Sequence, residues 1–150
     1  MRQCRDAFSP ARRARRADPP LPGGAAGGAG GYLFGSAARG EMEAHSDLDV
    51  AVHVDRALLP EAPFGYRAEL TTALIDATEG CDVDVVVLND ADPVLYHRVL
   101  RDGERLMSRD LRATTTREGY ALSRYCDWLP QLAKIEAAQR ARIERGDFGK

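Results

Sequence analysis

Three aspartates carry the clearest chemical signal in this sequence. Asp47 and Asp49 lie two residues apart in a segment that alternates polar and apolar side chains as a strand does, so both face the same side. Asp84 lies near the start of another strand-like segment and would join them if the two strands are neighbours. Because three carboxylates in one cleft repel each other, a hard cation such as Mg²⁺ is a natural partner. Two such ions could clamp the attacking and leaving oxygens of a phosphoryl transfer.

A short turn before these aspartates has residues that suit a phosphate group. Gly35 and Ser36 end an apolar run, and Ala37, Ala38 and Arg39 follow. A glycine lets the backbone approach a phosphate closely, successive N–H groups can form an anion-binding nest, and Arg39 could neutralise phosphate charge. Taken alone, the same residues would also suit an ordinary Gly-Ser turn beside a solvated arginine.

Strands and helices alternate along the part of the chain that must position these residues. Period-two patterns and apolar runs predict strands over residues 32–34, 47–54, 82–88 and 104–108. Helical spacing predicts helices over residues 66–78, 93–101 and 110–145. We expect Asp92 to cap the second helix, and Pro130 to kink or divide the third. The order predicts one α/β (α+β) domain, a small mixed sheet flanked by helices with a C-terminal helical segment.

The first 30 residues differ in composition from the rest. They contain six of the 21 basic residues and only two of the 23 acidic ones, and they end in a tract of proline, glycine and alanine. We expect residues 1–30 to form a low-complexity, disordered tail and residues 31–150 to form the domain. The domain then carries a net charge of −6, which argues against binding nucleic acid through its phosphates. No apolar run approaches the roughly 18 residues of a membrane span, so we expect a cytoplasmic protein without a membrane partner.

The spacing of the candidate residues resembles the signature of a known family. Gly35-Ser36, ten residues, and then Asp47-x-Asp49 is similar to the motif of the nucleotidyltransferase superfamily that includes DNA polymerase β. A closer resemblance, to the stand-alone minimal nucleotidyltransferases, is carried by three segments, residues 33–40, 46–52 and 83–89. The resemblance covers about residues 31–109 and extends more loosely over the helical segment that follows.

The resemblance implies the polymerase-β-like nucleotidyltransferase fold and gives roles to the candidate residues. The Gly-Ser turn would hold the triphosphate of ATP, with Arg39 beside it. Asp47, Asp49 and Asp84 would be the catalytic residues and would together hold two Mg²⁺ ions. The third metal ligand would be Asp84 rather than Asp82, and it would also help to deprotonate the acceptor hydroxyl.

The resemblance also suggests the acceptor. Minimal nucleotidyltransferases are often partners of small helical HEPN ribonuclease toxins, and act there as antitoxins by adding AMP to a tyrosine of the toxin. The polar helical segment 110–145 favours such a protein acceptor, because it offers no large second domain that could recognise a small molecule. Two alternatives stay open: a nucleotidyltransferase that modifies an aminoglycoside-like small molecule, and an antitoxin that neutralises its toxin by binding alone.

Overall fold

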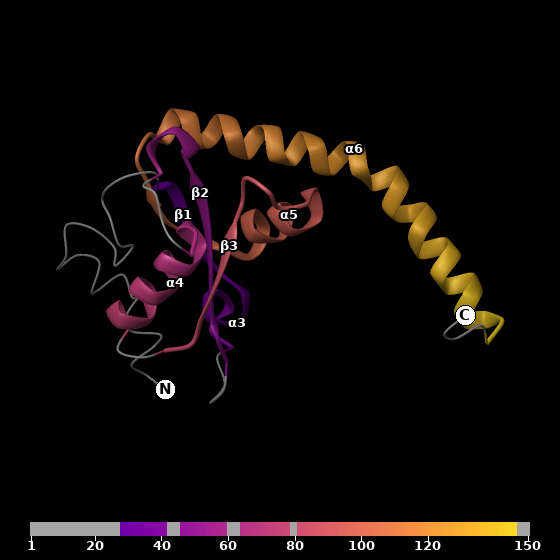
Figure 1. Ribbon diagram of the computed structural model, residues 1–150. Helices are drawn as coiled ribbons and strands as arrows, with labels where there is room; N and C mark the ends of the chain where they lie inside the picture. Colours follow the sequence, from indigo (N-terminus) through magenta and orange to yellow (C-terminus); the bar gives the residue numbers. More distant parts are fainter. Residues whose placement is uncertain (1–27, 42–45, 60–63, 79–80, 147–150) are drawn as a thin grey trace.

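The computed structural model describes residues 28–41, 46–59, 64–78 and 81–146 (Figure 1). The elements in these ranges are β1 (Gly28–Phe34), α3 (Gly35–Arg39), β2 (Leu48–Val54), the 3-10 helix η1 (Arg56–Leu58), α4 (Tyr66–Ala77), β3 (Val83–Val87), α5 (Pro93–Asp102), β4 (Glu104–Ser108) and α6 (Leu111–Glu144). All of the predicted strands and helices are present, but the predicted Gly-Ser turn is the start of the short helix α3, and the sequence predicts neither α3 nor η1. In the described ranges, no helix is both long and apolar enough to span a membrane.

The strands form one mixed sheet in the order β3-β2-β1-β4. β1 is antiparallel to both of its neighbours, β2 and β4, whereas β2 and β3 are parallel. The parallel pair requires a crossover, and α4 provides it between the two strands. The predicted small mixed sheet flanked by helices is confirmed.

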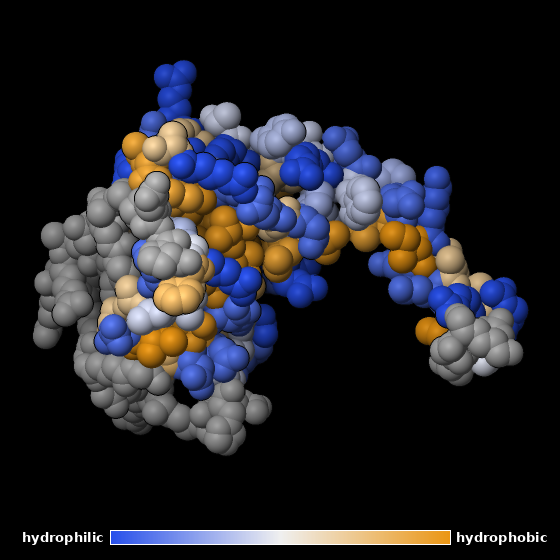
Figure 2. All heavy atoms as spheres, viewed as in Figure 1, coloured by the Kyte–Doolittle hydropathy of each residue, from blue (hydrophilic) through white to orange (hydrophobic). Residues whose placement is uncertain are grey.

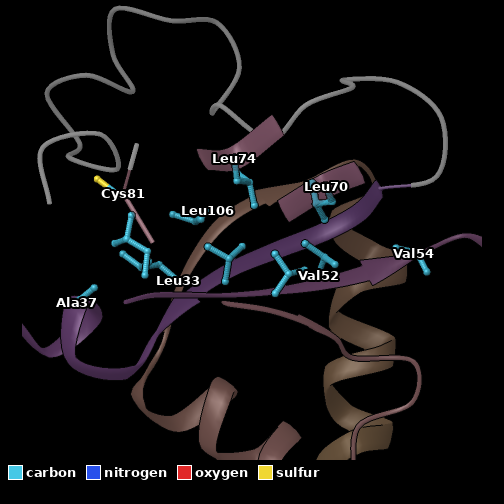
Figure 3. Packing of buried hydrophobic residues seen from close by; sticks show 11 residues of the cluster. Leu33, Ala37, Val52, Val54, Leu70, Leu74, Cys81 and Leu106 are labelled. Carbon is cyan, nitrogen blue, oxygen red and sulfur yellow. The ribbon is translucent and has the colours of Figure 1, made fainter. Parts of the chain in front are cut away.

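Helices cover both faces of the sheet because β2 is apolar on both sides. Val50, Val52 and Val54 pack with Leu70 and Leu74 of α4 in one buried cluster (Figure 3). The opposite face holds a second buried cluster, which packs beneath α5 and contains Tyr32, Phe34, Ala51, Leu88 and Val99. The second face is also the one toward which position 49 points, because residues 49, 51 and 53 alternate with the valines.

Helices α5 and α6 begin as their sequences predict. The Asp92 side chain accepts hydrogen bonds from the backbone N–H groups of Val94 and Leu95, both at 2.9 Å, so the predicted N-cap of α5 is confirmed.

Pro130 lies inside α6 and does not divide it, although the helix bends along its projecting part (Figure 1). Pro130 removes only one backbone donor, and in this exposed stretch water can satisfy the carbonyl that loses its partner.

The first strand is longer than predicted. β1 begins at Gly28, four residues before the expected start at Tyr32, and pairs through its glycines with both β2 and β4. Glycine has a low strand propensity, so the local pattern gives no sign of this extension. Most of the predicted tail, residues 1–27, lies outside the described residues, as does Gly80, the predicted end of α4.

Candidate active site

The register of the sheet brings the predicted site residues to one corner of the molecule. Phe34, the last residue of β1, pairs with Asp49 on β2, so Gly35 and Ser36 follow directly beside that aspartate. On the other side of β2, Asp49 pairs with Asp84 across the parallel ladder. Asp47 immediately precedes β2 and is exposed. The structure therefore groups the Gly-Ser turn with the three aspartates that the sequence singles out.

Gly35 lies against the Asp49 carboxylate and cannot be another residue without a change at the site. Its φ of +68° falls in the left-handed region that side chains disfavour. A Cβ atom added there would lie 1.9 Å from Oδ2 and 2.8 Å from Cγ of Asp49. The glycine thus allows the backbone that begins α3 to pass directly beside a candidate metal ligand.

Asp49 is the aspartate of this corner whose pKa the surrounding protein shifts. Its pKa is raised above the usual aspartate value, first by partial burial and then by the negative charges of Asp84 and Asp47. The positive charge of Arg39 acts in the opposite direction but does not cancel these effects. The three carboxylates are therefore near enough to repel each other, and their charges are only partly compensated by the protein.

Arg39 is placed near the site, but its side chain is bound elsewhere. Its Nε donates a hydrogen bond of 2.7 Å to Glu41, and the pair is exposed. The pKa of Arg39 is raised, chiefly by Glu41 and only weakly by Asp49. An exposed ion pair of this kind contributes little stability, so a phosphate could displace Glu41 from the guanidinium.

Arg67 is a neighbour of the site that the sequence does not reveal. It lies in the first turn of α4, and its guanidinium contacts Oδ1 of Asp84 at 3.1 Å. Both side chains are more than half exposed, so the pair adds little stability. An exposed arginine on a helix is common in any protein, and only the crossover of α4 places this one beside the third aspartate.

The residues at this corner have the chemistry to hold Mg²⁺. Within the described ranges, no three His, Cys, Asp or Glu side chains already form a group that could hold a metal ion. The donors are nevertheless all carboxylates, as Mg²⁺ prefers, and the raised pKa of Asp49 reports negative charge that a cation would relieve. Because the one partner of Asp84 among the described residues is its weak pair with Arg67, its carboxylate can turn toward a cation at small cost.

We expect Asp49→Asn to stabilise the metal-free protein at neutral pH. A raised folded-state pKa means that ionised Asp49 destabilises the fold above that pKa, and that this penalty disappears as the pH falls below about 3.9. The variant should therefore melt roughly 2 °C higher than the parent at pH 7 in EDTA, and at the same temperature near pH 3.5. A lower melting temperature of the variant at pH 7 would show that repulsion at this corner is not the dominant effect.

A known protein family matches the part of the chain that contains this corner of the sheet. The family described as Polymerase beta, Nucleotidyltransferase matches residues 30–112, which is more than half of the chain and includes the Gly-Ser turn and all three aspartates. The protein adenylyltransferase MntA of Shewanella oneidensis is 36% identical over 75 residues. This match spans 50% of the present chain and 50% of the MntA protein.

Two solved structures resemble this fold over about three quarters of the chain. A toxin–antitoxin crystal structure with AMP-PNP is 28% identical with a TM-score of 0.58, covering 74% of this chain and 86% of that one. A complex of a tri-AMPylated Shewanella oneidensis HEPN toxin with an MNT antitoxin is 26% identical with a TM-score of 0.55. It covers 74% of this chain and 82% of that one.

Proposed function

The chain belongs to the Polymerase beta, Nucleotidyltransferase family, and on that premise we propose that it transfers AMP from ATP to a tyrosine of a HEPN-family toxin. The transfer would require Mg²⁺ and would silence the toxin, so that the protein acts as an antitoxin. The observation that carries the proposal is the corner of the sheet where Gly35 lies against Asp49 and Asp49 pairs with Asp84. The names of its relatives, a protein adenylyltransferase and an MNT antitoxin, support the same reaction.

Each residue at this corner has a role in the proposed reaction. Gly35 and Ser36 would hold the triphosphate through backbone N–H groups and the serine hydroxyl, because a glycine with positive φ lets the chain curve around an anion. Asp47, Asp49 and Asp84 would hold the metal. When bound, Mg²⁺ would neutralise charge on the triphosphate and on the departing pyrophosphate.

The transfer exchanges one phosphorus–oxygen bond for another. The tyrosine oxygen of the acceptor forms a bond to the α-phosphorus of ATP, and the bond from that phosphorus to the bridging oxygen of the β-phosphate breaks. Pyrophosphate leaves with the electron pair of the broken bond. The proton of the tyrosine hydroxyl must be removed, and Asp84, which is exposed at the open side of the corner, is the residue that we assign to this step.

A projecting helix offers a surface for a protein acceptor. The first half of α6 packs on the domain, where the Tyr125 ring stacks on His97 with centroids 3.7 Å apart. The second half stands away from the domain, with hydrophobic side chains along its inner side (Figures 1 and 2). Tyr125, Trp128, Leu132 and Ile135 follow the alternating spacing of three and four residues with which one helix packs on another.

The direct test is to follow the nucleotide onto the acceptor. We would incubate the protein with Mg²⁺, ATP labelled at the α-phosphate and a HEPN-family toxin, and locate the label by gel and mass spectrometry. Label on a toxin tyrosine is the expected result. The matched control is the double variant Asp47→Asn/Asp49→Asn, which should bind the toxin and leave it unlabelled.

Other outcomes of this test would favour the alternative functions. If both versions form a stable complex, leave the toxin unlabelled and inhibit it equally, the protein neutralises by binding alone. If the toxin is neither bound nor labelled, but an aminoglycoside takes up the label, the acceptor is a small molecule. Both results would contradict protein AMP transfer, whereas they would leave the family assignment intact.

We expect the projecting half of α6 to decide acceptor binding. Trp128→Ser/Ile135→Ser removes two exposed apolar side chains, 42% and 41% accessible, from the proposed contact face. Binding of the toxin, measured by surface plasmon resonance, should weaken at least about tenfold, while the melting temperature of the isolated protein stays unchanged. Lys134→Ser alters an exposed residue of the same helix and is the matched control. Equal affinity of both variants for the toxin would place the contact elsewhere.

A further inference from the structure

A cavity lies on the same face of the sheet as the aspartates, but at the other end of β2. It has a volume of about 420 Å³ and lies between the end of β2, the start of α5 and the first half of α6. Its apolar walls include Leu88, Pro93 and Ala121. Cavities of about 300–1,000 Å³ with apolar walls and a few polar groups are typical of small-molecule sites. His53, which lines this cavity, is four residues beyond Asp49, or about 13 Å along the strand.

The charged side chains that line this cavity are two arginines. Arg117 and Arg124 of α6 both line it, and none of the described residues in its lining is an aspartate or glutamate. The Arg117 charge is close enough to lower the pKa of His53, although burial is the larger cause, and it also acts on Tyr96. Arg117 donates a 3.0 Å hydrogen bond to Thr114, which holds its guanidinium on the domain side of the helix.

The carboxylates that act electrostatically on His53 and Tyr96 are engaged with other partners. Asp55, which acts weakly on His53, accepts a hydrogen bond from the backbone of Ala57. Glu118, which acts on Tyr96, accepts bonds from Tyr32 and Arg105. An anion that entered the cavity would therefore meet two arginines without a competing carboxylate in the lining.

Aromatic rings and an unused imidazole complete the cavity. Tyr96 of α5 and Tyr120 of α6 both line it, and Tyr120 is 68% exposed. The Nδ1 atom of His53 is buried and, among the described residues, has no hydrogen-bond partner. A buried polar atom of this kind normally has a hydrogen-bond partner, so a ligand or a water molecule could supply one to Nδ1.

We propose that this cavity binds a nucleoside monophosphate, with the base between the tyrosine rings and the phosphate on Arg117 and Arg124. Stacking on aromatic rings suits the flat face of a base, and guanidinium groups suit a phosphate. The site is separate from the carboxylate corner and needs no metal ion. A nucleotide bound there would also contact both α5 and α6, so it would fasten the base of the projecting helix to the domain.

The test is a calorimetric titration of the full chain with AMP in EDTA. The parent protein and Asp49→Asn should bind AMP with equal affinity, because the aspartates take no part in this site. Arg117→Ser/Arg124→Ser should weaken binding at least about tenfold, and so should the single variant Arg124→Ser, whose exposed side chain is not needed for folding. Arg140→Ser, an exposed arginine of the same helix outside the cavity, should bind AMP as the parent does.

Three results would overturn the proposal. The first is absence of AMP binding by the parent protein. The second is binding that Asp49→Asn removes and Arg124→Ser leaves intact, which would place AMP at the carboxylate corner. The third is inorganic phosphate alone binding as tightly as AMP, which would leave no role for the base. None of these results bears on AMP transfer with Mg²⁺ and ATP, which is measured separately.

Discussion

Asp84→Asn should lower the rate of AMP transfer about 10²–10³-fold while leaving the fold intact. The carboxylate is the third member of the proposed metal group, and its place opposite Asp49 in the parallel ladder makes it the nearest neighbour of that residue on β3. Its side chain is exposed, so the substitution removes charge without opening a cavity. The expected loss is in the rate of label transfer to the toxin at saturating ATP.

The matched control for this prediction is Asp82→Asn. Asp82 is also an exposed aspartate, two residues earlier in the chain, and its backbone carbonyl accepts a bond from Leu48 regardless of its side chain. The charge of Asp84 raises the pKa of Asp49, so the Asp84 carboxylate is within electrostatic reach of the site. We expect less than a threefold change in rate for Asp82→Asn. A large loss there with little loss at Asp84 would mean that the third ligand is wrongly assigned.

The site could be predicted from the sequence because its residues depend on local patterns. Alternation along β2 fixes the side of the sheet that Asp49 faces, and the apolar run before Gly35 places that glycine at the end of a strand. The helix between β2 and β3 makes a parallel pair of strands the simplest connection. These patterns leave open whether the strand of Asp84 lies next to the strand of Asp49, and the register of the sheet answers that question.

The remaining features depend on tertiary contacts that no local pattern contains. Arg67 meets Asp84 only because α4 crosses back over the sheet, and its position in the sequence looks like any solvated helical residue. The cavity beside His53 exists because α5 and α6 leave a space at the end of β2. In both cases the missing information is the direction in which a helix leaves the sheet. The sequence also leaves open whether Pro130 kinks or divides its helix, and α6 continues through Pro130.

Gly35→Ala should abolish transfer while the protein stays folded. The added Cβ would lie 1.9 Å from Oδ2 and 3.2 Å from Cβ of Asp49, so the carboxylate must rotate away from its present position. Alanine at a φ of +68° adds a backbone cost of roughly 1–2 kcal/mol, which is smaller than the stability of most domains. We expect at least about a 10²-fold loss of transfer and a melting temperature only a few degrees lower.

Gly65→Ala separates backbone strain from contact with the carboxylate. Gly65 also has a positive φ, +82°, but a Cβ added there would meet no atom within 4 Å. Both variants should therefore lose some stability. Mg²⁺ and ATP should raise the melting temperature of the parent because they bind the folded state, and only Gly35→Ala should lose both this rise and the transfer. If Gly65→Ala lost transfer to the same degree, general destabilisation would explain the effect. A fully active Gly35→Ala would show that Asp49 can leave its present position and still serve the reaction, and the close approach at Gly35 would then have no catalytic role.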